Sequence, residues 1–292
     1  MIGWLIYNLE DVEKNSRYIQ FYMEEGKKLG IDIELRLADY MQFGVRERKN
    51  FLLYNNESAV SPDFCVVRCI YPLLTKQLEC LGIPVFNNSF VSEICNDKAK
   101  TYQYVASLGI KMVESFFYKN HYFNQLKKLP FKETVIKSVS GHGGNEVFLL
   151  RESEELDEVL TQCHKKDIVV QPLTGSRRED LRVYVLGDKI LAAILRKAKD
   201  GFKSNFSLGG EVTEYQLNEE EVSIVKKIIG IFDFSLVGID FIIGDEGELI
   251  FNEIEDVVGA RMLYQCTDIN LVYEYLSFIK DKVTKTSESR EW

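Results

Sequence analysis

The sequence predicts a mixed α/β and α+β fold, in which an amino-terminal domain with a parallel sheet precedes an antiparallel-rich portion. Apolar strand segments alternate with amphipathic helices over about the first ninety residues, which is typical of a parallel sheet with crossover helices. Farther along, strands follow one another through short turns, which indicates antiparallel hairpins. The 292 residues, 46% hydrophobic and 28% charged, suffice for about two domains and exclude a disordered chain.

The amino-terminal domain is predicted from apolar periodicity and from glycines that end helices. Asn15 or Ser16 can cap the first helix, which ends at Gly30, and Gly82 ends the second. Strand residues either form continuous apolar runs or alternate with charged residues. The predicted strands are residues 1–7, 31–37, 64–70 and 84–86, and the predicted helices are residues 15–30 and 74–81.

The rest of the chain is predicted to be rich in hairpins. Gly109 closes a helix, and Gly187-Asp188 forms the tip of one hairpin. A frayed polar tail is expected from Thr284. The predicted strands are residues 134–137, 146–151, 168–171, 181–186, 189–197, 236–243 and 248–253, and the predicted helices are residues 97–108, 154–164, 219–231 and 268–283.

Charge and composition argue against several classes of protein. The 36 Lys and Arg residues face 45 Asp and Glu residues, and the net charge of −9 argues against a nucleic-acid or anionic-membrane binder. The amino terminus lacks a signal-peptide pattern, and no apolar run is long enough to span a membrane. The 6 cysteines form no CxxC pair, and the 3 histidines lack zinc-ligand spacing. We therefore expect a cytoplasmic globular protein with reduced thiols.

The last predicted hairpin carries acidic residues at the ends of apolar runs. Its turn, residues 244–247, has an even length. Without a bulge, such a turn places Ile243 opposite Glu248 and Asp240 opposite Phe251. Asp240 and Phe251 are then expected to point to the same face of the sheet.

Glu253 and Glu255 alternate with Phe251 and are therefore expected on the same face as Asp240. Carboxylate oxygens are the ligands that Mg²⁺ prefers, together with water and substrate phosphates. A solvated acidic face is the alternative interpretation. However, carboxylates that follow buried apolar runs need compensation for desolvation and mutual repulsion. A bound metal supplies that compensation.

Two further segments suggest nucleotide binding. Lys137 ends a strand and is followed by the glycine-rich stretch 138–145, whose backbone N–H groups can surround phosphates. This stretch is neither a P-loop nor a dinucleotide fingerprint, and an ordinary hairpin loop is the alternative interpretation. Gln171 and Pro172 follow another strand. Because proline lacks an N–H group, we expect the chain there to leave the regular ladder and to offer backbone groups to a flat base.

The ordered set of motifs resembles the ATP-grasp superfamily, in particular its RimK-like branch of ribosomal-protein glutamate ligases and the related amino-acid ligases of lysine biosynthesis. The match runs from about Asp63 to Glu255. In order, the motifs are Asp97-Lys98, Val135-Ile136-Lys137, Gly141-x-Gly143-Gly144, Gln171-Pro172, Asp180-Leu181-Arg182, Arg196, Lys203-Ser204-Asn205, Val237-Gly238-Ile239-Asp240 and Asn252-Glu253-Ile254-Glu255.

The resemblance implies an ATP-grasp fold and a role for each matching residue. It implies an amino-terminal pre-ATP-grasp domain (residues 1–95), a small lobe with the glycine-rich loop (96–172), a large lobe with the metal site (173–285) and a tail (286–292). It implies contacts with ATP from Lys98, Lys137, Gly141, Gly143, Gly144, Gln171, Pro172, Asp180, Lys203, Ser204 and Asn205, metal ligation of Mg²⁺ or Mn²⁺ by Asp240, Glu253 and Glu255, and stabilisation of a phosphorylated intermediate by Arg182 and Arg196.

Arginines are also candidates for binding a substrate carboxylate, because a guanidinium makes two parallel hydrogen bonds to it. Arg68 follows an apolar strand at the expected carboxyl end of the first sheet, where ligands of open α/β sheets bind. Arg261 follows the acidic hairpin. Surface solvation is the alternative for both residues, and a structural pair with Asp180 is the alternative for Arg182.

The implied reaction is an ATP-dependent carboxylate–amine ligation that forms ADP and phosphate through an acyl phosphate. A small-molecule kinase and a non-catalytic ATP-binding module are the alternatives. The chain departs from the family where Glu255 replaces the usual asparagine and in the loop up to Arg261. The identity of the carboxylate and the amine therefore does not transfer. The expected partners are small molecules or a peptide or protein terminus, and a homo-oligomer is compatible with the sequence.

Overall fold

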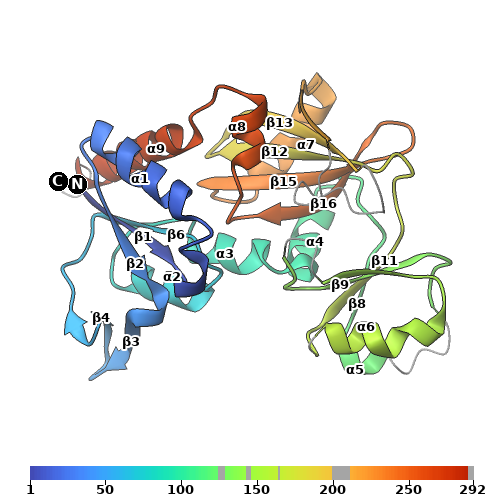
Figure 1. The fold of residues 1–292 in the computed structure, drawn as a ribbon, viewed down its shortest axis with the longest axis horizontal. Coiled ribbons are helices and arrows are strands. Elements are labelled where there is room, and N and C mark those ends of the chain that lie inside the picture. The colour runs from blue at the N-terminus through green and yellow to red at the C-terminus, as the bar shows by residue number, and fades with distance from the viewer. Residues whose placement is uncertain (124–128, 143–145, 164, 199–210, 289–292) are drawn as a thin grey trace.

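The computed structural model describes residues 1–123, 129–142, 146–163, 165–198 and 211–288. Within these residues the strands form a parallel sheet at the amino end, a small three-stranded sheet beside it, and two antiparallel sheets in the rest of the chain. Figure 1 shows the parallel sheet on the left and the two larger antiparallel sheets on the right, with helices between them. The predicted α/β and α+β fold class is confirmed.

The amino-terminal sheet has the order β2-β1-β6-β7, with all of its strands parallel. Its core contains buried apolar side chains on both faces, because helices cover both sides. The last helix of the chain, α9, returns to this domain and packs against α1 (Figure 1). The elements are β1 (Ile2–Tyr7), η1 (Leu9–Asp11), α1 (Ser16–Lys28), β2 (Asp32–Leu37), β6 (Phe64–Val67), α2 (Pro72–Cys80), β7 (Val85–Phe86), α3 (Ser89–Cys95) and α9 (Leu271–Glu288).

A three-stranded sheet between β2 and β6 was not predicted. Its hairpin turn is formed by Glu47 and Arg48, which have positive φ angles of 51° and 64°. Asn and Gly are the usual residues in such turns, so the turn has no clear sequence signal. The amide of Gln77 in α2 holds the hairpin through the carbonyl oxygens of Gly44 (2.9 Å) and Phe51 (3.1 Å). The elements are η2 (Ala38–Tyr40), β3 (Met41–Arg46), β4 (Lys49–Tyr54) and β5 (Glu57–Ser58).

The middle of the chain forms an antiparallel sheet of order β10-β9-β11-β8. Helices α5 and α6 cover one face and contribute to its core. Helix α4 lies between this sheet and the second antiparallel sheet and contacts strands of both (Figure 1). The elements are α4 (Lys98–Ala106), β8 (Phe116–Tyr118), α5 (Asn120–Phe123), β9 (Thr134–Ser138), β10 (Val147–Leu150), η3 (Ser153–Glu155), α6 (Leu156–Gln162) and β11 (Ile168–Pro172).

The second antiparallel sheet has the order β14-β13-β12-β15-β16. Along β12, Leu181 and Val183 join one core with α4 and α7, whereas Tyr184 faces the core shared with the amino-terminal domain. The polar residues Asp180 and Arg182 alternate with that first set. The elements are β12 (Glu179–Leu186), β13 (Lys189–Lys197), β14 (Glu211–Tyr215), α7 (Glu219–Ile229), β15 (Leu236–Ile243), β16 (Leu249–Glu255) and α8 (Arg261–Cys266).

Two predictions about element ends were wrong. The strand predicted over residues 64–70 ends at Val67. The chain from Thr284 is helical as far as Glu288 rather than frayed, because α9 continues through it. The cysteines are free thiols, as expected. Among the described helices, none combines the length and the apolar character needed to cross a bilayer.

Candidate active site

The acidic hairpin has a different register from the predicted one. Leu249 rather than Glu248 pairs with Ile243, and the register shifts again beside Asp240, so that Asn252 is left as the extra residue of a β-bulge. The predicted register is therefore wrong at the turn and misses the bulge. Both features are local backbone choices that strict alternation of side chains does not reveal.

The bulge decides which side chains face the site. Phe251 pairs with Phe241, and both are fully buried in the core. Asp240 pairs with Glu253, so Phe251 and Glu253 point to opposite faces of the sheet. The sequence prediction put them on the same face. Its two register errors cancel for the acidic residues, and Asp240, Glu253 and Glu255 do share a face.

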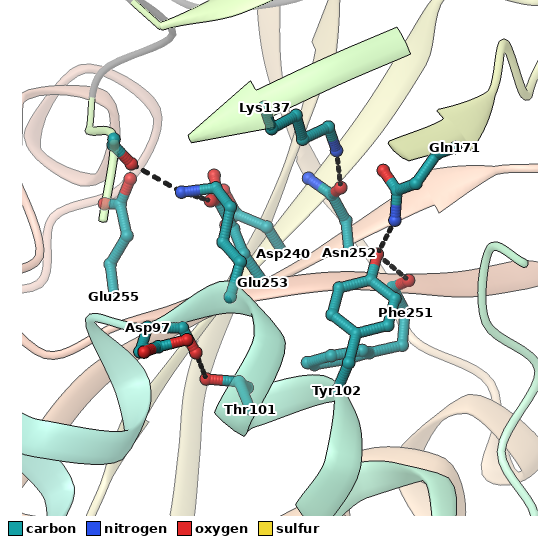
Figure 2. Close-up of polar contacts among 12 residues, drawn as sticks. Asp97, Thr101, Tyr102, Lys137, Gln171, Asp240, Phe251, Asn252, Glu253 and Glu255 are labelled. Carbon is teal, nitrogen blue, oxygen red and sulfur yellow. Dashed lines mark hydrogen bonds and ion pairs between the residues drawn. The ribbon is translucent and has the colours of Figure 1, made fainter. Parts of the chain in front are cut away.

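These three carboxylates form a compact cluster. One oxygen from each of Asp240, Glu253 and Glu255 lies within 4.8 Å of the others. Figure 2 shows the three side chains converging beside the strand that carries Lys137. Glu253 and Glu255 also line a cavity of ≈ 510 Å³. An all-oxygen donor set beside an open cavity fits Mg²⁺, which binds a few carboxylates and completes its shell with water and phosphate oxygens.

Two arginines from neighbouring strands neutralise much of this charge. Arg182 lies directly across from Asp240 and donates to both of its oxygens, from Nε (2.8 Å) and Nη2 (2.7 Å). Its Nη1 lies 2.8 Å from Oε2 of Glu255. Arg196 reaches Asp240 from the next strand, with Nη2 2.8 Å from Oδ2. Burial raises the pKa of Asp240, but the two arginines lower it to about 2, so the carboxylate is ionised.

Asp180 pairs with Arg196 rather than with Arg182, the partner that the sequence offered as an alternative. The two residues are cross-strand neighbours, and the guanidinium of Arg196 contacts both carboxylate oxygens of Asp180. Burial raises the pKa of Asp180 to about 6, against the opposing effect of Arg196. Each arginine thus binds one acid on the adjacent strand and a second acid on the strand beyond it.

Two lysines approach the cluster from the other side. Lys98 is the first residue of α4. Its Nζ lies 3.1 Å from Oε2 of Glu253 and also donates to the carbonyl oxygen of Gly141. Lys137 on β9 donates from Nζ to Oδ1 of Asn252 at 2.9 Å (Figure 2). Burial lowers the pKa of Lys137 to about 8, Glu253 acts against that shift, and Lys98 adds to it. Among the described residues, Lys137 forms no ion pair with a carboxylate, and its hydrogen bond goes to the neutral Asn252 amide.

Gln171 and Pro172 lie at the end of β11. The buried amide of Gln171 donates to the hydroxyl of Tyr102 at 2.8 Å (Figure 2). It also donates to the hydroxyl of Ser115 at 2.8 Å. Pro172 stays in the ladder opposite Thr134, so the prediction that the chain leaves the ladder there is wrong. Proline is tolerated because its missing N–H group is not required on that edge.

The glycine-rich loop is described only in part. Gly141 accepts from Lys98, and His142 lines the ≈ 510 Å³ cavity. Burial, with a smaller effect of Lys98, lowers the pKa of His142 to about 4, so its ring is neutral near pH 7. Five predicted nucleotide-binding residues lie outside the described residues, namely Gly143, Gly144, Lys203, Ser204 and Asn205.

The two predicted substrate arginines line the same cavity as the acids. Arg68 is buried, and Arg261 at the start of α8 is exposed. Both line the ≈ 510 Å³ cavity together with Arg182, Arg196, Glu253 and Glu255. Arg68 and Arg261 also border a second cavity of ≈ 710 Å³ on the side of α1 and α8.

Sequence reasoning missed several residues that shape the site. Asn252 could have been found only by recognising the bulge, because it precedes Glu253 in the motif without an assigned role. Tyr102 and Ser115 fix Gln171 from distant parts of the chain, and no local pattern marks them. His142 lies inside the glycine motif, and its position there was the available signal.

Comparisons with known proteins find a family model and relatives that match most of this chain. The family model described as RimK-like ATP-grasp domain matches residues 95–279. An uncharacterized MG011 homolog of Mycoplasma pneumoniae is 28% identical over 269 residues, which cover 91% of this chain and 88% of that protein. A probable alpha-L-glutamate ligase of Legionella pneumophila is 26% identical over 223 residues, with 74% of each chain covered.

Solved structures share the fold over nearly the whole chain. The VanG D-Ala:D-Ser ligase of Enterococcus faecalis has a TM-score of 0.73 at 16% identity, with 96% of this chain and 98% of that chain covered. The ATP-grasp ligase PsnB, complexed with a phosphomimetic variant of its minimal precursor, Mg and ADP, has a TM-score of 0.67 at 14% identity. That likeness covers 95% of this chain and 97% of PsnB.

Proposed function

Because this chain belongs to the RimK-like ATP-grasp family, we propose that it is an ATP-dependent carboxylate–amine ligase. In the proposed reaction a substrate carboxylate attacks the γ-phosphate of ATP, which gives an acyl phosphate and ADP. An amine then attacks the acyl carbon, the C–N bond forms, and inorganic phosphate leaves. The observation that carries the proposal is the compact cluster of three carboxylates, two arginines and two lysines beside a cavity.

The charge of the cluster suits a metal-bound nucleotide. The numbers of carboxylates and cationic side chains in the cluster are equal. The carboxylates are those of Asp180, Asp240, Glu253 and Glu255, and the cations are those of Lys98, Lys137, Arg182 and Arg196. ATP⁴⁻ with two Mg²⁺ carries no net charge, so it can enter without unbalancing the cluster. We propose that Asp240, Glu253 and Glu255 would hold the metal, whose chemistry is to neutralise phosphate oxygens during transfer.

The lysines are placed to exchange partners when ATP binds. We propose that Lys98 leaves Glu253 and that Lys137 leaves Asn252, and that both amines then bind phosphate oxygens. Lys137 gains the most, because it is half-buried and its hydrogen-bond partner among the described residues, Asn252, is neutral. A phosphate oxygen is a charged acceptor and makes a stronger hydrogen bond than the Asn252 amide.

The adenine ring is proposed to lie along the end of β11. Pairing between β11 and β8 ends at Val170, so the edge beyond it is available to a flat base at Gln171 and Pro172. The side chain of Gln171 is engaged by Tyr102 and Ser115, so its backbone is the group we assign to adenine. The proposed roles of Gly141, Gly143, Gly144, Lys203, Ser204 and Asn205 around the phosphates rest on the resemblance.

Arg182 and Arg196 are proposed to stabilise the phosphoryl group and the acyl phosphate. Both guanidiniums border the cavity while their acidic partners hold them in place. Asp180 is proposed to position Arg196 at the nucleotide. Closure of the glycine-rich loop is proposed to exclude water, because an acyl phosphate otherwise hydrolyses.

The proposal is tested by phosphate release from Mg-ATP with pairs of carboxylic acids and amines. A ligase releases phosphate only when both are present, with the amide as product. A small-molecule kinase would instead form a stable phosphoester from a hydroxyl compound, and a non-catalytic module would bind ATP without consuming it. Either of these results would refute the ligase assignment. Glu253→Gln, which should abolish release, controls for a contaminating enzyme.

A further inference from the structure

Arg68 is a buried guanidinium that forms no ion pair with a carboxylate among the described residues, although the buried Asp256 interacts with it electrostatically. The residue is 9% exposed, and its Nη2 donates to the carbonyl oxygen of Val258 at 3.0 Å. Its Nε has no hydrogen-bond partner within the described part of the chain. Arg182 and Arg196, which are equally buried, are instead paired with acids. An unpaired buried charge costs several kcal/mol, so Arg68 is suited to an anion that arrives from outside the chain.

Three tyrosines, Tyr7, Tyr18 and Tyr22, lie close enough to Arg68 to interact with it electrostatically. Their hydroxyls are buried, and none of the three has a hydrogen-bond partner among the residues that the structure describes. Tyr7 is 2% exposed, and the ring of Tyr18 lies under the guanidinium of Arg68 with 5.3 Å between Cζ and the ring centroid. Buried polar groups are normally satisfied, and several unsatisfied donors at one place indicate a missing acceptor.

The position of these residues in the sheet is one that binds ligands. Tyr7 ends β1 and Arg68 follows β6, its parallel neighbour, and the N–H group of Arg68 donates to the carbonyl oxygen of Ile6 at 2.7 Å. In the order β2-β1-β6-β7 the chain progresses in opposite directions from β1 and from β6. Ligands of open α/β sheets bind at such a switch point, at the carboxyl ends of the strands.

Arg68 also stands between the two cavities. The ≈ 510 Å³ cavity is lined by Tyr7, Glu253 and Glu255, among others, and Tyr18 is part of the lining of the ≈ 710 Å³ cavity. Arg68 lines both of them. A molecule that reacts beside the acids can therefore extend one end to Arg68 without leaving the site.

We propose that Tyr7, Tyr18 and Arg68 form a binding subsite for a substrate carboxylate that the reaction does not consume. The inference rests on the proposed ligase function, and it makes one substrate either a dicarboxylic acid or an amine that carries a carboxylate. The planar carboxylate accepts hydrogen bonds from Nε of Arg68 and from the two phenol hydroxyls. Within the described part of the chain, these are donors that lack an acceptor.

The first test is titration of the full chain with glutarate, a dicarboxylate, and butyrate, a monocarboxylate of similar length. Glutarate should bind more tightly than butyrate, and Tyr7→Phe and Arg68→Met should each weaken glutarate binding about tenfold or more, the range for a hydrogen bond to a charged group. Tyr7→Phe should not lower the melting temperature, since no described residue forms a hydrogen bond with the Tyr7 hydroxyl. Unchanged glutarate affinity in Tyr7→Phe would overturn the subsite.

A matched control is Tyr275→Phe. The hydroxyl of Tyr275 donates to the carbonyl oxygen of Phe86 at 2.9 Å, so its loss should lower the melting temperature and leave glutarate affinity unchanged. If Tyr275→Phe weakens glutarate binding as much as Tyr7→Phe does, the effect is a general one and the subsite is refuted.

The second test identifies which substrate supplies the carboxylate. In the phosphate-release assay the acid is varied between glutarate and butyrate, and the amine between an amino acid and its amide. The KM of the substrate that uses the subsite should rise in Tyr7→Phe while kcat stays within about twofold. If none of the acid–amine pairs makes the wild type release phosphate, the proposed ligase function fails. The glutarate titration then decides the subsite on its own.

Discussion

Asp240→Asn tests the balance of charge in the acidic hairpin, because Asp240 is 1% exposed and holds two guanidiniums. The carboxyl pKa moves from 3.8 to about 2 on folding, which corresponds to about 2 kcal/mol of folding stability at neutral pH. Breaking a buried pair leaves the partner charge uncompensated, which raises the expected loss toward about 3–5 kcal/mol. We expect Asp240→Asn to be destabilised by about 2–5 kcal/mol.

Urea unfolding at pH 7, followed by circular dichroism, measures this loss. Glu179→Gln is a matched control on the neighbouring strand β12, since Glu179 pairs with the exposed Lys197 and should cost less than about 1 kcal/mol. The pKa of Asp240 is lowered in the folded state, so its contribution is complete above pH 3.8 and is lost as the pH falls toward 2. If Asp240→Asn were as stable as Glu179→Gln at pH 7, the assigned ion pairs would be wrong.

Three further predictions concern the nucleotide. Glu253→Gln should abolish phosphate release while changing stability by less than about 1 kcal/mol, because Glu253 is partly exposed; normal turnover would remove it from the metal site. Lys137 has a pKa of about 8 in the free protein, and a bound phosphate should raise that pKa. ATP binding at pH 8.5 should therefore take up a proton and should weaken as the pH rises further. Calorimetry in buffers of different ionisation enthalpy measures the proton uptake, and equal uptake by Lys137→Ala would contradict this role. Gln171→Leu should lower stability by about 1–3 kcal/mol by leaving the buried Tyr102 hydroxyl and the half-buried Ser115 hydroxyl without their donor, and an unchanged urea midpoint would refute that role.

The larger elements of the fold could be predicted from local patterns. Strand β1 is a buried apolar run. Helix α4 begins at Lys98, after the N-cap Asp97, whose side chain accepts from the N–H group of Lys100. The hairpin of β3 and β4 could not be predicted, because its turn uses Glu47 and Arg48 in the left-handed region instead of Asn or Gly. Local sequence fails where the backbone adopts a conformation that its residues rarely choose.

The candidate site was predicted as a set of residues rather than as a geometry. Asp240, Glu253 and Glu255 were expected together, and they lie together, but through a bulge at Asn252 that no side-chain pattern announces. The pairing of Arg196 with Asp180 depends on which strands are neighbours, which is set by the whole sheet. Contacts between distant segments are the part that a single sequence leaves open.

The most direct test of the whole account is a crystal structure of the chain with Mn²⁺ and a non-hydrolysable ATP analogue. We predict an anomalous peak between Asp240, Glu253 and Glu255, with the triphosphate beside Lys98 and Lys137. A nucleotide bound elsewhere, or a metal peak away from these carboxylates, would contradict the account.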